Sequence, residues 1–340
     1  MKKSKKVEYN SIMLGILIGT IFLKSHFKPP IMKRIIDFSD TTSSLHIQNQ
    51  QLIIELVDGE THSIPVDEIA AVIFSSYRLN LTKSVLELLA QCGAIAIICD
   101  ERKMPVGMAL PIEGHHLQSR FVKEQASVSL PTQKRLWKQI VCAKIRAQSQ
   151  NLNCIHKSDA ALGRLEKEVK SGDETNIEGR AARKYWSALF RGEKFSRNSD
   201  AQDKINSSLN YGYAVLRGIV ARSVVASGLN PSLGLFHHNK YNAFCLADDL
   251  MEPFRPVVDN SVWKLWQQNA LDEGITTPVK KALIGAITGR YVIDNRQETI
   301  FEAATRATAS LTAVFCGQGN KLCLPEKLPF MIKAKSKVED

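Results

Sequence analysis

The chain has 340 residues, of which 44% are hydrophobic and 23% charged, and 45 Lys and Arg outnumber 34 Asp and Glu for a formal net charge of +11. This composition excludes a disordered chain, a collagen-like repeat and a disulfide-stapled scaffold. The length suggests about two domains, since roughly 100–200 residues per domain is usual. The positive charge indicates a polyanion or an acidic surface as partner.

The charge is divided unevenly along the chain. Residues 1–31 carry a net charge of +5, residues 32–116 of −5 and residues 117–340 of +11. An asymmetry of this kind is typical of a nucleic-acid-facing half, although solvated helical faces explain the cations equally well. We therefore expect any DNA or RNA contact in the C-terminal two-thirds.

The seven cysteines form no C-x-x-C pair, and most lie in apolar stretches. Neither a zinc site nor a disulfide framework is indicated. A thiol in such a stretch behaves as a small hydrophobic group. A reducing, cytoplasmic location fits this cysteine usage best.

The first 31 residues are considered separately. A basic start, MKKSKK, precedes an apolar run from Ile12 to Leu23, which resembles a secretory signal but lacks a small-x-small cleavage site. The run is also too short to span a bilayer as a helix. Because Met32 stands directly before a strand-like stretch, we interpret residues 1–31 as an upstream extension or misassigned start, with a membrane anchor as the alternative.

Residues 32–114 are predicted to form a small β-rich, sandwich-like domain. Short strand-like stretches separated by turns indicate β-hairpins in series. One helix is expected from a cap at Thr82 to a stop at Gly93. The predicted strands are RIIDF, SLHIQ, LIIEL, THSIPV, IAAVIF, AIAIIC and residues 105–110.

After Gly114 the apolar residues recur at helical spacing, as in the stripe of Leu136, Ile140, Ala143 and Ala147. This predicts a larger all-helical domain over residues 115–325 and a tail over residues 326–340. The fold class is therefore α+β, with the β-rich domain first and the helical domain second.

The sequence contains no phosphate-binding G-x-x-x-x-G-K-S/T loop, no G-x-G-x-x-G, no H-E-x-x-H and no G-x-S-x-G. ATP hydrolysis, dinucleotide chemistry and serine hydrolysis are therefore disfavoured. Three other stretches of the helical part combine titratable and basic residues. They are NIEGRAARKYW at 176–186, LGLFHHNKYN at 233–242 and DDLMEPFRPVVD at 248–259.

Glu178 has two interpretations. Thr175 and Glu178 stand as T-x-x-E, so a helix capping box explains both without any chemistry. Alternatively, the neighbouring cations Arg180, Arg183 and Lys184 favour a metal-binding carboxylate close to phosphates.

The other two stretches offer an imidazole and further carboxylates. His237 and His238 adjoin apolar residues, where a histidine is more often a core or rim residue than a ligand. Asp249 and Glu252 share a helical face, which an acidic helix start also explains. Two carboxylates and an imidazole that converged would suit Mg²⁺ or Mn²⁺, and such an ion can polarise a phosphodiester. Spacing does not show that they converge.

The stretches NIEGRAARKYW, LNYGYAVLRG and GLNPSLGLFHHNKYNAFCLADDLMEPFRPVVD follow the predicted strands in this order. Together they resemble the CRISPR-associated spacer-acquisition integrase and endonuclease, the first-numbered Cas protein, in its type II locus form. The resemblance covers residues 32 to about 315.

The resemblance implies roles for particular residues. The metal-binding and catalytic residues would be Glu178, His237 and Glu252, whereas Asp249 would act less directly and His238 would not be a ligand. The expected DNA contacts are Arg180, Arg183, Lys184 and Arg255.

The resemblance also implies an activity and partners. A prespacer 3′-hydroxyl would attack a phosphodiester of a CRISPR repeat, using Mg²⁺ or Mn²⁺ and no ATP, and the same site would cleave DNA. The expected partners are DNA, a second copy in a homodimer formed through the β-rich domain, the small second-numbered CRISPR-associated protein and the type II effector nuclease. The alternatives are a branched-DNA repair nuclease, a catalytically silent DNA-binding subunit and a membrane-tethered basic protein.

Overall fold

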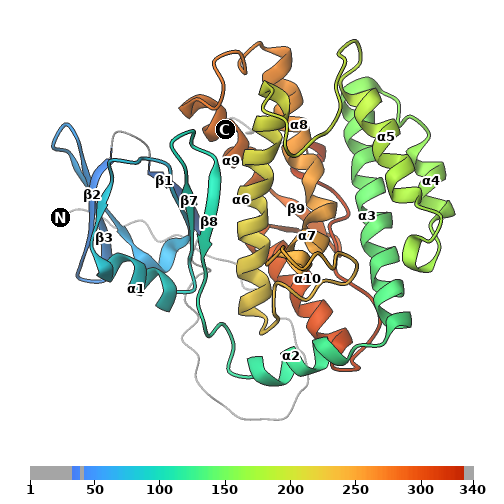
Figure 1. Cartoon of the computed structure of the whole chain (residues 1–340), viewed down its shortest axis with the longest axis horizontal. Helices are drawn as coiled ribbons and strands as arrows, with labels where there is room; N and C mark the ends of the chain where they lie inside the picture. Colours follow the sequence, from blue (N-terminus) through green and yellow to red (C-terminus); the bar gives the residue numbers. More distant parts are fainter. Residues whose placement is uncertain (1–32, 39–41, 333–340) are drawn as a thin grey trace, which may run out of the picture. The chain divides into compact units, whose positions relative to one another are not determined.

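The computed structural model describes residues 33–38 and 42–332. The predicted extension over 1–31 and the last eight residues lie outside the described residues. Strands come first and helices second, which confirms the α+β class (Figure 1). Within the described ranges, no helix combines the length and apolar character needed to cross a bilayer.

Seven strands of the N-terminal part match the predicted stretches closely, and the short β6 (Asn80–Leu81) was not predicted. Helix α1 (Lys83–Gln91) also begins after Thr82 and ends before Gly93, whose φ of +68° suits glycine. The strands are β1 (Arg34–Phe38), β2 (Thr42–Gln48), β3 (Gln51–Leu56), β4 (Thr61–Pro65), β5 (Ile69–Phe74), β6 (Asn80–Leu81), β7 (Ile95–Cys99) and β8 (Pro105–Ala109).

These strands form two four-stranded sheets, of order β4-β3-β2-β6 and β1-β5-β7-β8. The antiparallel β2-β3-β4 meander confirms the predicted hairpins. The prediction is wrong for the other sheet, where β1, β5 and β7 are parallel. Parallel strands need a crossover connection, and α1 lies between β5 and β7 in the chain.

The two sheets share an apolar core, and the sheet containing β5 is covered on both faces. Val72 and Phe74 of β5 pack with Leu45 and Leu52 of the opposite sheet. Ile73 instead joins the cluster of the helical part. All six residues of β5 are therefore buried, as expected of a strand enclosed on both sides. Figure 1 shows α6 alongside β7 and β8.

The C-terminal part is mainly helical. Its helices are α2 (Gln118–Ser127), α3 (Leu130–His156), α4 (Leu162–Glu168), α5 (Ile177–Leu189), α6 (Lys204–Ala226), α7 (Cys245–Met251), α8 (Arg255–Gln267), α9 (Thr277–Ile287) and α10 (Ile300–Phe315), with short 3-10 turns η2 (Ser171–Asp173), η3 (Glu252–Phe254) and η4 (Pro329–Met331). A further 3-10 turn, η1 (Val66–Glu68), precedes β5.

Two details of the predicted helical part are wrong. It is not all helical, because β9 (Tyr291–Ile293) and β10 (Arg296–Glu298) form an antiparallel hairpin. Residues 326–332 of the predicted tail are also packed: Val292 exchanges backbone hydrogen bonds with Glu326 and Lys327, and Leu328 is buried.

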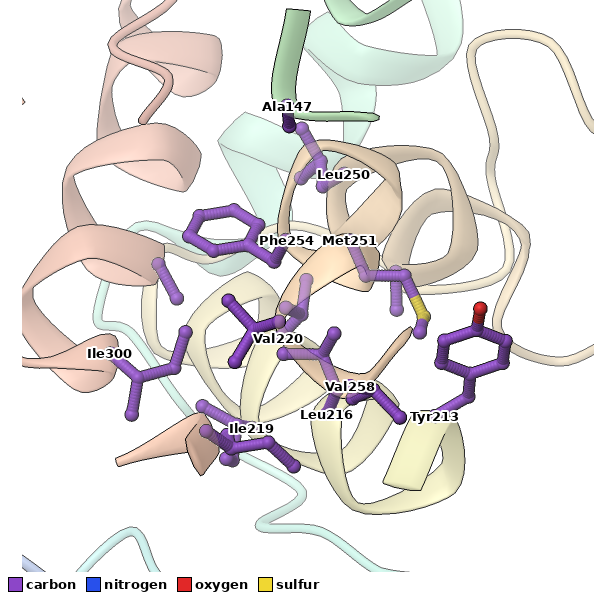
Figure 2. Packing of buried hydrophobic residues seen from close by; sticks show 14 of the residues in the cluster. Ala147, Tyr213, Leu216, Ile219, Val220, Leu250, Met251, Phe254, Val258 and Ile300 are labelled. Carbon is purple, nitrogen blue, oxygen red and sulfur yellow. The ribbon is translucent and has the colours of Figure 1, made fainter. Parts of the chain in front are cut away.

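Helix α6 forms the centre of the helical part and contacts α7, α8 and α10. Figure 2 shows Leu216 and Val220 of α6 meeting Met251 of α7 and Phe254 of η3. A Cβ at Gly212 would lie only 2.4 Å from Cγ1 of Val258. This close approach of α6 to α8 sets the position of the α7-η3-α8 segment, which carries the acidic residues considered next.

Candidate active site

The three residues predicted as metal ligands lie together. Glu178 of α5, His237 of the α6-α7 loop and Glu252 of η3 line one cavity of about 300 Å³. Lys144 and Gln148 of α3 line the same cavity. The convergence that sequence spacing left open is thus present in the fold, while the ligand roles of these residues stay a prediction.

The capping-box interpretation of Glu178 is wrong. The residue that caps α5 is Asn176, whose side chain accepts a hydrogen bond from the Gly179 amide at 3.0 Å. Asp173 accepts the amides of Ile177 and Glu178, both at 2.9 Å. With these amides already satisfied, the Glu178 carboxylate is free to face the cavity, where it contacts the Lys144 ammonium.

Glu252 is only 4% exposed and lies where α7 passes into η3. Its carboxylate pairs with Lys144 Nζ at 2.6 Å and with Arg255 Nη2 at 3.1 Å. Burial by itself raises the pKa of the Glu252 carboxyl, but the two cations outweigh burial and the pKa is lowered. The cavity therefore contains a buried, ionised carboxylate.

His237 is held by Asp249 of α7, which is fully buried. Asp249 Oδ1 lies 2.5 Å from His237 Nδ1, and Oδ2 accepts the amides of Leu235 and Phe236 at 2.6 and 3.0 Å. The hydrogen bond to Asp249 raises the pKa of the imidazole. Since Asp249 occupies Nδ1, the nitrogen available to a ligand is Nε2.

His238 lies in a different place from His237. It lines a separate cavity of about 380 Å³ with Asn239, Lys240 and Asn242, in agreement with its predicted exclusion from the ligand set. The Phe236 ring stacks on Trp137, with ring centroids 4.3 Å apart. The alternating side chains of this loop thus pack in different directions, which separates the two imidazoles.

The residues that line the cavity also include a buried acid, Asp259, which contacts two tyrosines. Asp259 of α8 accepts hydrogen bonds from the hydroxyls of Tyr185, at 2.8 Å, and Tyr213. Burial raises the pKa of the Asp259 carboxyl from 3.8 to about 6. The Tyr213 ring also packs beneath the guanidinium groups of Arg197 and Arg255, at 5.4 and 4.8 Å from the ring centroid.

The predicted DNA-contacting residues divide into two groups. Arg255 lines the cavity, whereas Arg180, Arg183 and Lys184 are exposed on the face of α5 away from it. Sequence reasoning missed Arg197, which also lines the cavity and is held by Asn206 and Asn210 at 2.8 and 2.6 Å. Another cavity, of about 400 Å³, shares Arg197, Tyr213 and Arg255 with the cavity that Glu178, His237 and Glu252 line.

Sequence reasoning also missed Lys144, although a signal for it exists. Lys144 follows Leu136 and Ile140 at intervals of four and precedes Gln148 by four, so it interrupts the buried stripe of α3. Its side chain is 12% exposed. Burial lowers the pKa of the ammonium, but Glu252 and Glu178 outweigh burial and the pKa is raised. A lysine within the apolar stripe of a helix therefore indicates that an oppositely charged side chain lies close to it.

The side chains that line the cavity include oxygen and nitrogen donors of the kind that bind divalent cations. As they stand, no three His, Cys, Asp or Glu side chains within residues 33–38 and 42–332 form a ready metal-binding group. Lys144 Nζ instead contacts both carboxylates. The Glu252 carboxylate is buried and lines the cavity together with the Glu178 carboxylate and the His237 imidazole. Two carboxylates beside an imidazole are a donor set suited to Mg²⁺ or Mn²⁺.

Comparison with known proteins gives consistent results for most of the chain. The family model described as CRISPR associated protein Cas1 matches residues 38–286. The chain is 38% identical over 288 residues to the CRISPR-associated endonuclease Cas1 of Neisseria meningitidis, covering 84% of this chain and 93% of that protein. It is 26% identical to a CRISPR-associated endonuclease Cas1 of Pyrobaculum aerophilum, covering 69% and 83%.

Solved structures share the fold at lower sequence identity. A casposase bound to an integration product has a TM-score of 0.69 at 19% identity, covering 90% of this chain and 93% of that one. A Cas1 protein from Thermotoga maritima has a TM-score of 0.66 at 20% identity, covering 84% and 97%. A chain of a Cas6-RT-Cas1–Cas2 complex has a TM-score of 0.69 at 17% identity, covering 86% and 36%.

Proposed function

Because the chain belongs to the Cas1 family of CRISPR-associated proteins, we propose that it is a metal-dependent DNA integrase and endonuclease of CRISPR adaptation. The observation that supports this most directly is the convergence of Glu178, His237 and Glu252 in one cavity. The proposed substrates are a prespacer with free 3′ ends and the CRISPR repeat.

In this proposal Glu178, Glu252 and Nε2 of His237 hold Mg²⁺ or Mn²⁺. When bound, such an ion supplies Lewis-acid polarisation of the scissile phosphodiester and a template for the attacking hydroxyl. Asp249 keeps the His237 ring in place through Nδ1. Arg197 and Arg255 line the cavity, and their planar guanidinium groups suit the phosphate oxygens of a DNA strand.

The reaction exchanges one phosphodiester for another. The oxygen of a prespacer 3′-hydroxyl forms a bond to the phosphorus at the end of the repeat, and the bond from this phosphorus to the 3′-oxygen of the flanking nucleotide breaks. The attacking hydroxyl loses one proton and the leaving 3′-oxygen takes one up. Because no high-energy bond is consumed, no ATP is required. With water in place of the hydroxyl, the same site would cleave DNA, which accounts for the endonuclease activity named in the relatives.

The proposed assembly contains DNA, a homodimer of this chain and the small second-numbered CRISPR-associated protein. Two neighbouring structures support the DNA and hetero-complex parts, because one is a casposase with its integration product and another is a Cas1–Cas2 complex. The β-rich domain, residues 32–114, is proposed to form the homodimer. The helical domain, residues 115–325, would bind DNA, and the type II effector nuclease is a further proposed partner.

Strand transfer by Glu178→Ala tests the proposed function. We expect the variant to lose Mn²⁺-dependent joining of a labelled 3′-hydroxyl oligonucleotide to repeat-containing DNA while it still binds duplex DNA. Glu174→Ala is the matched control, because Glu174 is an exposed acid nearby that pairs only with Lys134 among the described residues. Unchanged joining by Glu178→Ala would refute the catalytic assignment. Spacer acquisition in cells separates this function from branched-DNA repair.

A further inference from the structure

We propose that Lys144 is a displaceable internal counter-ion: its ammonium occupies the place of the divalent cation in the metal-free site and moves to Gln148 when the cation binds. The inference rests on the proposed function, because it concerns the same cavity. It assigns a positioning role to a residue of α3 that belongs to none of the three site stretches.

The Lys144 ammonium contacts both carboxylates of the site. Lys144 Nζ lies 2.6 Å from Glu252 Oε2 and also contacts Glu178 Oε1. It therefore bridges the two carboxylates that are proposed to share one ion. Because the Lys144 side chain is almost enclosed, the ammonium is part of the site and does not belong to a mobile surface lysine.

The charge of the Lys144 ammonium helps to balance the charges of the two carboxylates. Glu178 and Glu252 are offset by Lys144 and by Arg255, which pairs with Glu252 at 3.1 Å. Without Lys144, two carboxylates would face each other with one cation fewer, which is unfavourable in a buried site. With Lys144 unmoved, a divalent ion would add two positive charges to a balanced site, next to an ammonium.

The Lys144 ammonium and a divalent cation would need the same space between the two carboxylates. A divalent cation of this kind contacts carboxylate oxygens at about 2.0–2.2 Å, closer than a hydrogen bond. An ammonium already in contact with both carboxylates stands where such an ion must lie. The two cations therefore compete for the same oxygens, and binding of one requires the other to leave.

Gln148 offers the displaced ammonium a second position. Gln148 lies one helical turn beyond Lys144 on α3 and lines the same cavity. Its side chain is only 3% exposed, and Oε1 accepts no hydrogen bond from the residues that the structure describes. Residues four apart on a helix are side-chain neighbours. A buried acceptor without a donor is costly, and the displaced ammonium would satisfy it.

Mn²⁺ binding in the absence of DNA, measured by electron paramagnetic resonance titration, tests the proposal. We expect Lys144→Met to bind Mn²⁺ more tightly than the wild type by about tenfold, within the usual range of coupling between two binding events. Lys138→Met is the matched control, since Lys138 lies on the same helix, is exposed and does not line the cavity. It should bind like the wild type. Equal or weaker binding by Lys144→Met would overturn the proposal.

Gln148→Met tests the second position of the ammonium. It should weaken Mn²⁺ binding when Lys144 is present and have no effect in the Lys144→Met background, so the two substitutions should be non-additive. Equal effects of Gln148→Met in both backgrounds would overturn the proposal. If Lys144→Met does not fold, Gln148→Met alone decides: weaker binding than the wild type supports the proposal and unchanged binding refutes it.

Glu178→Gln distinguishes failure of this inference from failure of the proposed function. If the wild type and Glu178→Gln bind Mn²⁺ equally, the metal site itself is refuted and the Lys144 proposal falls with it. If Glu178→Gln loses binding while Lys144→Met matches the wild type, the metal site stands and only the role of Lys144 is refuted.

Discussion

The carboxylate of Asp249 and the imidazole of His237 are 2.5 Å apart, and Asp249 is completely enclosed by protein. The same carboxylate accepts three backbone amides of the loop that carries His237. One side chain thus fixes both the loop and the ring, so that Nε2 remains for a ligand. Carboxylate-imidazole pairs of this kind orient the histidine ligands of many metal sites.

Asp249→Asn should reduce Mn²⁺-dependent strand transfer by about 10–100-fold, the usual effect of losing the residue that orients a ligand. The amide oxygen can still accept the backbone hydrogen bonds, so the protein should fold. Strand-transfer rates and Mn²⁺ affinity, measured on the same preparation, check this expectation. Wild-type values for both would show that His237 does not depend on Asp249.

The adjacent histidines form a natural pair of variants. His237→Ala should abolish strand transfer, because the imidazole lines the cavity with Glu178 and Glu252. His238→Ala should leave the transfer rate unchanged, because His238 lines a separate cavity. Initial rates at saturating Mn²⁺ compare the two variants, and a larger loss in His238→Ala would reverse the ligand assignment.

The contribution of Asp259 to the free energy of unfolding should decrease as the pH rises. Its pKa is raised from 3.8 to about 6 in the folded protein by burial, so between these values the folded state holds more protons than the unfolded state. Stability from this group is therefore full below about pH 4 and is lost by about pH 6, a change of about 3 kcal/mol. Urea unfolding from pH 4 to 7 should show this loss in the wild type relative to Asp259→Asn. Identical pH dependence in both proteins would contradict the burial of an ionisable Asp259.

Two glycines test the packing that positions the site. Gly212→Ala should destabilise the protein by about 1–3 kcal/mol, because its Cβ would lie 2.4 Å from Val258 Cγ1. Gly285→Ala is the control in α9, where nothing lies within 4 Å of the added Cβ. It should stabilise the protein by about 0.4–1 kcal/mol. Thermal unfolding measures both changes, and an unaffected Gly212→Ala protein would show that α6 and α8 are not in close contact.

Local patterns predicted the strands better than their pairing. Alternating apolar residues identify β2, β3 and β4, and their turns bring them together as hairpins. The direction of β1 relative to β5 depends on a connection through the other sheet, which no local pattern contains. The β9-β10 hairpin escaped prediction because each strand has only three residues.

Short sequence motifs predicted the three proposed ligands, but they did not predict the other charged residues that line the cavity. Glu178, His237 and Glu252 stand in distinctive stretches, whereas Lys144 and Arg197 lie outside those stretches and reach the cavity through packing. The capping box failed for a local reason. Asn176 adopts the left-handed conformation, with φ of 50°, and caps α5 one residue after Thr175.

The location of Mn²⁺ in a crystal, determined from its anomalous scattering, shows whether Glu178, His237 and Glu252 hold the metal. We expect one ion within about 2.0–2.3 Å of Glu178, Glu252 and Nε2 of His237, with the Lys144 ammonium displaced from between the carboxylates. An ion bound elsewhere, or a cavity that stays free of Mn²⁺ at saturating concentration, would contradict this expectation.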